Sequence, residues 1–254
     1  MIRIKRLRFF GIGNAIRRVL LVLNLIQKPE NYLKPLYNAV LKNVQEYEDA
    51  IRKVNYLGLP RHPDKPKNWD SAAALAIILE FCKNRSGRIL DAGGESYSSI
   101  LTQLSYCGYK NLTCLNLSYY RKPKQKNILF ETGDITKTKY ENNYFNAITC
   151  ISVIEHGIDI KSYLTEMYRI LQPGGILFTS TDYWCTPVDT KNKKAFGVPI
   201  MIFNSKDITK IIELANDLGF RLIGELDLKC GEKAVRWDEF DLAYTFIYFT
   251  LQKT

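Results

Sequence analysis

The sequence has few of the residues from which disulfide frameworks and histidine-based metal sites are built. Its six cysteines are scattered, and no two of them form a C-x-x-C pair. Only two histidines are present, His62 and His156, too few and too separated for a histidine-rich metal site. We therefore predict no metal centre, and free thiols in a reducing compartment rather than disulfides.

Long apolar runs are also missing. No stretch reaches the roughly 18 apolar residues that a membrane-spanning helix needs. A cleaved signal peptide is disfavoured because Arg17 and Arg18 interrupt the apolar stretch near the amino terminus. We therefore expect a cytoplasmic protein. Its 254 residues, of which 46% are hydrophobic, are enough to bury a substantial core.

Negative charge is absent from the first 28 residues, which carry seven positive charges of the formal net +10. The rest of the chain therefore contributes only +3. The segment AIRRVLLVLNLIQ can form an amphipathic helix, which beside a basic start is typical of contact with an anionic membrane. Such contact would place the protein peripherally at the inner membrane surface. The alternative is a helix that packs on the main domain and exposes its basic face.

A proline-rich stretch divides the chain. Residues 1–58 are predicted to be mostly helical, because their apolar residues recur at helical spacing. Residues 59–70, LPRHPDKPKNWD, contain three prolines and are predicted to form a linker or an ordered loop. We predict a basic helical extension with its proline-rich loop over residues 1–68, and one further domain over residues 69–254.

After residue 70, short apolar strands alternate with helices, which predicts an α/β fold with a doubly wound, mostly parallel sheet. Asp70 or Ser71 is predicted to cap the first of these helices. The last two predicted strands, RLIGELDL and LAYTFIYFTLQ, have no crossover between them and should pair as an antiparallel hairpin at the sheet edge. The other predicted strands are RILDA, LTCLNLS, ILFETGD, NAITCISVIEH and GILFTSTDY, and the predicted helices are AAALAIILEFCK, SSILTQLSYCG, IKSYLTEMYRIL and SKDITKIIELANDLGF.

The segment GRILDAGGESYSS, residues 87–99, has the pattern of a nucleotide-binding turn. An apolar strand ends at Asp91, two glycines follow, and small polar residues precede a helix. Ligands of open α/β sheets bind at the carboxyl ends of the strands, where such a turn brings backbone N–H groups close to them. Gly93 and Gly94 supply the permissive backbone, whereas Glu95 stands where glycine is often kept. We interpret this as a functional variant of the turn.

Four segments, taken in order, resemble those of class I S-adenosylmethionine-dependent methyltransferases. They are ILDAGGES, GDIT, FNAITCISVIEHG and RILQPGGILFTST. The resemblance covers about residues 69–254. It implies a seven-stranded Rossmann-like sheet with an antiparallel carboxy-terminal hairpin, S-adenosylmethionine as the cofactor, and methyl transfer as the activity.

The resemblance also implies the cofactor contacts. Asp91 would support the turn and the methionine amino group, Gly93 would let the cofactor lie against the backbone, and Gly94 and Glu95 would complete the turn. Asn116 stands where relatives usually have the acid that grips the ribose hydroxyls, and it lacks the charge that roughly doubles such a bond. Asp134 and Ile135 would contact the adenine. Ser152 would lie beside the methionine and methyl end of the cofactor.

Two substitutions follow from these assignments. Asn116→Asp is expected to preserve or tighten cofactor binding, because it restores a charged partner for the ribose. Gly93→Val is expected to block binding by filling the space in which the ligand meets the backbone.

A sulfonium methyl is already activated, so its transfer requires mainly alignment and exclusion of water. A hydroxyl acceptor also benefits from a base within hydrogen-bond reach. We predict His156 as that base, since imidazole titrates near neutrality, with Glu155 and Asp182 as further candidates. The alternative is that His156 only packs beside the cofactor. His62 could close over the site, but a solvated loop histidine is the simpler interpretation.

The acceptor is not determined by these motifs. A small molecule or a sugar, including a glycan on a surface, fits a cytoplasmic domain with a basic arm, and methylation at oxygen is expected. RNA is a rival acceptor, because a basic surface attracts phosphates. Against it, the excess charge is confined to one terminal segment and no nucleic-acid module is recognised. A third hypothesis is a non-catalytic binding or scaffold protein, motivated by Asn116 and by the bulky Tyr97 in the glycine turn.

Overall fold

The computed structural model describes residues 16–17, 19–20, 28–119, 125, 127–195 and 197–254. Most of the basic amphipathic segment therefore lies outside the described residues, and its contact with a membrane stays a prediction. Arg17 is described and buried. Its guanidinium donates to the carbonyl oxygens of Leu57 at 3.2 Å and Tyr106 at 2.8 Å, so the segment touches the body of the protein here.

Among the helices that the structure describes, none is both long and apolar enough to cross a membrane.

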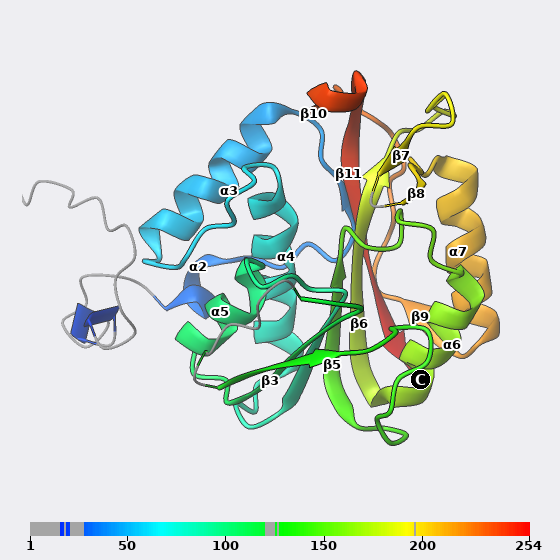
Figure 1. Ribbon diagram of the computed structural model, residues 1–254. Helices are drawn as coiled ribbons and strands as arrows, with labels where there is room; N and C mark the ends of the chain where they lie inside the picture. Colours follow the sequence, from blue (N-terminus) through cyan, green and yellow to red (C-terminus); the bar gives the residue numbers. More distant parts are fainter. Residues whose placement is uncertain (1–15, 18, 21–27, 120–124, 126, 196) are drawn as a thin grey trace, which may run out of the picture.

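A nine-stranded sheet forms the centre of the molecule (Figure 1). Its strand order is β1-β11-β6-β5-β2-β3-β4, and β9 and β10 also pair with β11. The five strands from β2 to β6 run parallel, and β11 runs antiparallel to β6. This confirms the predicted doubly wound, mostly parallel sheet. The strands are β1 (Ala39–Val40), β2 (Arg88–Ala92), β3 (Asn111–Asn116), β4 (Ile128–Thr132), β5 (Phe145–Ile151), β6 (Leu171–Tyr183), β9 (Phe220–Leu222), β10 (Val235–Trp237) and β11 (Leu242–Lys253).

Helices cover both faces of the sheet, which explains why its central strands are continuous apolar runs. In β2, Ile89 packs into the core on one face and Leu90 into the core on the other. Figure 1 shows the two helical layers on opposite sides of the strands. One layer consists of α2 (Pro29–Tyr32), α3 (Val44–Tyr56), α4 (Lys67–Phe81) and α5 (Ser99–Tyr106), and the other of α6 (Ile160–Ile170) and α7 (Ser205–Asp217).

The start of α4 differs from the prediction, because neither Asp70 nor Ser71 caps it. The helix begins at Lys67, and Pro66 before it already has helical φ and ψ. Proline is favoured at helix starts, since its fixed φ suits the helix and its missing N–H would have no partner there. Asp70 is instead fully buried in the first turn, where its carboxylate accepts hydrogen bonds from the Ser71 amide and the Ser180 hydroxyl.

The predicted mostly helical segment, residues 1–58, contains a short strand. Ala39 and Val40 form β1, which pairs antiparallel with the middle of β11. The chain then returns to helix at α3, whose N-cap Asn43 accepts a hydrogen bond from the Glu46 amide. Apolar spacing alone did not reveal this strand, because two residues are too few to display a period.

The carboxy-terminal hairpin is present but shorter than predicted. Only β9 pairs with the end of β11, through Phe220 to Leu222. The rest of the outer edge of β11 is covered by β1 and β10, so three short strands from separate parts of the chain close this edge. The strands β7 (Lys194–Ala195) and β8 (Val198–Pro199) form a separate two-stranded sheet.

Candidate functional site

The glycine turn follows β2 in the middle of the sheet. Gly93 has φ of +82°, a left-handed conformation that side chains disfavour, and its amide donates to the Leu115 carbonyl at 2.7 Å. Gly94 is packed against the Asp91 carboxylate, which leaves no room for a Cβ atom. Both glycines are therefore needed to form the turn itself.

The structure corrects the reason given for the Gly93 prediction. A Cβ atom at this position would lie 2.5 Å from the Val153 side chain, within the protein rather than in ligand space. We expect Gly93→Ala to lower the free energy of unfolding by about 1–2 kcal/mol from the backbone conformation, and further through the clash. Adding Val153→Ala should recover the clash component, as measured by urea unfolding. A Gly93→Ala variant as stable as the wild type would contradict this account.

Asp91 lies buried beneath the turn, where it is 1% exposed. Its carboxylate accepts a hydrogen bond from the Thr149 hydroxyl at 2.8 Å. Burial raises the pKa of Asp91 from 3.8 to about 7, with a smaller contribution from the nearby Asp70 carboxyl. A cationic ligand group placed above this carboxyl would stabilise its ionised form.

Asn116 ends β3 and is turned toward the glycine turn. Its Nδ2 donates to the Glu95 carboxylate at 2.9 Å, the Gly94 carbonyl at 3.2 Å and the Gly93 carbonyl at 3.4 Å. Its Oδ1 accepts from the Leu117 amide at 2.7 Å. The amide thus holds three acceptors of the turn together, which a carboxylate in its place could not do.

This geometry reverses the expectation for Asn116→Asp. An aspartate would place a second negative charge beside Glu95 and two carbonyl oxygens, with no N–H to donate. We expect the affinity for S-adenosylhomocysteine, measured by calorimetry, to fall about tenfold to a hundredfold. Adding Glu95→Gln, which supplies a donor opposite the new carboxylate, should recover part of the loss. Equal or tighter binding by the single variant would show that the amide does not organise the turn.

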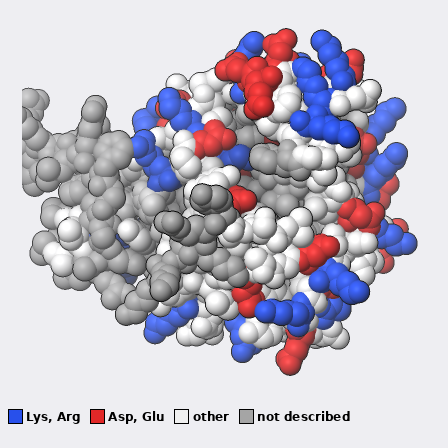
Figure 2. All heavy atoms as spheres, in the orientation of Figure 1, with Lys and Arg blue, Asp and Glu red and all other residues white. Residues whose placement is uncertain are grey.

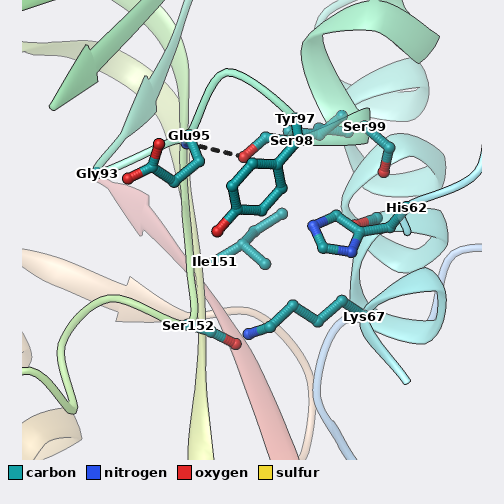
Figure 3. Close-up of a pocket in the computed structure, with 11 residues that line it drawn as sticks. His62, Lys67, Gly93, Glu95, Tyr97, Ser98, Ser99, Ile151 and Ser152 are labelled. Carbon is teal, nitrogen blue, oxygen red and sulfur yellow. Dashed lines mark hydrogen bonds between the residues drawn. The ribbon is translucent and has the colours of Figure 1, made fainter. Parts of the chain in front are cut away.

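A pocket opens at the carboxyl ends of β2 and β5 (Figure 3). Its cavity volume of about 70 Å³ is smaller than the roughly 300–1,000 Å³ typical of whole ligand sites. Three parts of the chain line it: the loop and start of α4, the glycine turn with the start of α5, and the end of β5. The lining residues are His62, Lys67, Ser71, Gly93, Glu95, Tyr97, Ser98, Ser99, Ile100, Ile151 and Ser152.

Two buried hydroxyl groups in the pocket have no hydrogen-bond partner among the described residues. They belong to Ser99, which is 4% exposed, and Ser152, which is 9% exposed. Ser152 also has φ of +51°, unusual for a residue with a side chain. Strained backbone and unpaired polar atoms cluster at sites that bind ligands. They fit a polar cofactor here, beside the turn.

The structure brings together only part of the predicted cofactor set. Gly93, Glu95 and Ser152 line the pocket, and Asp91, Gly94 and Asn116 support it from beneath or behind. The two positions implied for the adenine do not line it. Asp134 is exposed and accepts from the Thr136 amide and hydroxyl, and Ile135 is buried in the core.

The three predicted catalytic side chains lie at the neighbouring strand ends. Glu155 and Asp182 are buried, 2% and 4% exposed, and the Glu155 carboxylate accepts from the Thr181 hydroxyl at 3.0 Å. Burial, followed by the charge of Glu155, raises the pKa of Asp182 well above its ordinary value. His156 is half-buried and does not line the pocket. Within the described chain, no group of three potential ligand side chains is arranged around a metal position.

The proline-rich loop forms one wall of the pocket. His62 is buried rather than solvated, at 8% exposed, and lines the pocket opposite Tyr97. The Asn68 side chain fixes the loop by accepting from the His62 amide and donating to the His62 carbonyl. Lys67 and Tyr97 were also missed as lining residues. The available signal was the amide side chain of Asn68, which follows three closely spaced prolines.

The parallel sheet, its antiparallel last strand and the glycine turn at the central strand define the class I S-adenosylmethionine-dependent methyltransferase fold. Among solved structures, an S-adenosylmethionine-dependent methyltransferase from Mesorhizobium loti superposes with a TM-score of 0.52 at 15% identity. The match covers 72% of this chain and 100% of that one. Residues 90–179 match the family described as methyltransferase domain.

Two curated relatives extend the comparison. The sterol 24-C-methyltransferase of Aspergillus fumigatus is 25% identical over 127 residues, which cover 48% of this chain and 33% of that protein. The demethylmenaquinone methyltransferase of Deinococcus radiodurans is 41% identical over 54 residues, which cover 21% and 22% of the two chains. This chain therefore matches a third or less of the length of either relative.

Proposed function

We propose that this protein transfers a methyl group from S-adenosylmethionine to a small-molecule or glycan acceptor, at oxygen. The observation that carries the proposal is the pocket beside the glycine turn, in which two buried hydroxyl groups lack partners. The methyltransferase-domain match over residues 90–179, which runs from β2 into β6, supports the same conclusion.

When bound, S-adenosylmethionine supplies a methyl group activated by the sulfonium. The chain has to hold the acceptor in line with it, exclude water and remove the hydroxyl proton as the new carbon–oxygen bond forms. The Glu155 and Asp182 carboxyls are better suited than His156 to remove the hydroxyl proton, because His156 does not line the pocket. Lys67 lines the pocket and interacts electrostatically with Asp182. The Asp182 carboxyl and the neighbouring Glu155 carboxyl therefore lie near the pocket.

Two observations favour a small-molecule acceptor over RNA. The curated relatives are a sterol methyltransferase and a demethylmenaquinone methyltransferase, both named for small-molecule acceptors. On the face in Figure 2, the described positive and negative side chains are intermixed, without the one-signed patch that a phosphate backbone attracts.

The test has two stages. Calorimetry with S-adenosylmethionine should show saturable binding to the full chain, and failure to bind would favour the non-catalytic hypothesis. Release of S-adenosylhomocysteine should then be assayed with hydroxylated small molecules, glycans and RNA as separate acceptor pools. Turnover with RNA alone would overturn the proposed acceptor class.

A further inference from the structure

Two half-buried cysteines from distant parts of the sequence meet near the carboxyl end of β6. Cys185 lies two residues after this strand, and Cys230 lies in the segment of residues 223–234 that joins β9 to β10. The Cys185 amide donates a hydrogen bond to Sγ of Cys230, with 2.8 Å between the nitrogen and the sulfur. All six cysteines lie in the part of the chain that the structure describes, and these two are the one pair joined by a hydrogen bond.

This contact brings the two cysteines close enough for a disulfide bond. The Cα atom of Cys185 is one bond, about 1.5 Å, from the amide nitrogen that donates to the sulfur. The Cα atom of Cys230 is two bonds from that sulfur. The two Cα atoms are therefore at most about 7 Å apart, which is the limit beyond which a disulfide requires the backbone to move.

The segment that carries Cys230 is held in place on both sides of the cysteine. The hydroxyl of Tyr183, the last residue of β6, donates to the Leu228 carbonyl at 2.7 Å. Beyond the cysteine, the Glu232 amide donates to the Lys42 carbonyl at 2.7 Å. The position of Cys230 beside the end of β6 therefore rests on contacts that do not involve its sulfur.

We propose that Cys185 and Cys230 form a reversible disulfide bond, which fixes residues 223–234 to the end of β6 when a low-molecular-weight disulfide is present as the oxidant. One cysteine thiolate attacks the oxidant and displaces a thiolate, which leaves a mixed disulfide on the protein. The second cysteine thiolate then attacks this mixed disulfide and displaces the other thiolate. Two protons and two electrons pass from the protein to the oxidant, which leaves as two thiols.

The pair is expected to oxidise slowly at neutral pH. Burial, and then the Cys185 thiol, raise the pKa of the Cys230 thiol above its ordinary value. Because the thiolate is the attacking species, the rate of closure should rise about tenfold per pH unit above neutrality. Neither cysteine lines the pocket beside the glycine turn, so the disulfide does not depend on methyl transfer by the chain.

Peptide mapping tests the bond directly. The reduced full chain is treated with glutathione disulfide, blocked with N-ethylmaleimide and digested with trypsin. Residues 170–191 and 230–233 should appear as one linked product, two hydrogens lighter than the separate peptides, and dithiothreitol should separate them. Cys185→Ser and Cys230→Ser should each abolish the link and leave a glutathione adduct on the remaining cysteine. Cys107→Ser, which removes another half-buried thiol, should leave the link unchanged.

Thermal unfolding supplies a second measurement. Oxidation should raise the Tm of the wild type and of Cys107→Ser by several degrees, because the bond closes a long loop without moving the backbone. It should not raise the Tm of either of the other two variants. The proposal is overturned if glutathione adds to both cysteines without linking them, or if neither cysteine reacts at pH 9. A linked protein whose Tm does not rise would also overturn it, because the bond would then distort the fold.

Discussion

Replacing Asp182 by asparagine is expected to lower turnover on a hydroxyl acceptor by about 10²- to 10⁴-fold, the usual contribution of a positioned general base. The reason is the buried pair that Asp182 forms with Glu155 at the carboxyl ends of β5 and β6. Burial and the neighbouring charge raise the pKa of Asp182 well above its ordinary value. An ionised carboxylate whose pKa is raised is a stronger base than an exposed one.

The matched comparison uses the neighbouring histidine. Glu155→Gln should also lose activity, because the charge of the Glu155 carboxylate contributes to the raised pKa of Asp182. His156→Ala should retain most of the turnover. In all three variants, calorimetry should find S-adenosylhomocysteine affinity within a few-fold of the wild type. A large loss in His156→Ala with full activity in Asp182→Asn would assign the proton transfer to the histidine, as the sequence alone suggested.

The stability of the ligand-free protein is expected to fall as pH rises from 4 to 8, in part because of Asp91. The pKa of its carboxyl is raised from 3.8 to about 7 in the folded state. The folded state therefore binds the proton more tightly than the unfolded state does. The Asp91 contribution is fully present below pH 4 and is lost as pH rises through about 7, at a total cost of about 4 kcal/mol.

Asp91→Asn removes this titration and should make the pH profile shallower. Urea unfolding at intervals from pH 4 to pH 8 gives the free energy of unfolding of each protein. The difference between wild type and variant should shift by about 4 kcal/mol across this range, in favour of the variant at high pH. Asp70 titrates in the same window, since burial raises its pKa to about 6, but it is present in both proteins. Parallel profiles would show that Asp91 is already ionised in the folded state.

The elements with strong local signals were predictable from the sequence. The strand RILDA matches β2 residue for residue, and the helix through residues 160–171 matches α6 to within one residue. These segments are apolar runs or amphipathic repeats closed by clear turn residues, so local pattern and tertiary packing agree. The order of such segments also sufficed to indicate the methyltransferase fold.

The features that the sequence did not predict depend on contacts between segments that are far apart along the chain. The donor role of Asn116 toward Glu95 exists only because β3 lies beside the glycine turn, and spacing along the chain does not report which way an amide points. The burial of His62 depends on Asn68 and on the position of α5, neither of which has a periodic signal. A resemblance assigns a role to a position, whereas the hydrogen bonds decide whether that residue can perform it.

The closure of the β11 edge has a consequence for how the chain reaches its native state. Asn38 lies beside β1, and its side chain accepts a hydrogen bond from the Thr250 amide, 212 positions further along the chain. It also donates to the carbonyls of Ile223 and Glu225. Contacts between segments so far apart in sequence form slowly, because a long loop must close first. During synthesis, β1 cannot pair until β11 has left the ribosome, so this edge of the central sheet closes only after residues 242–253 have emerged.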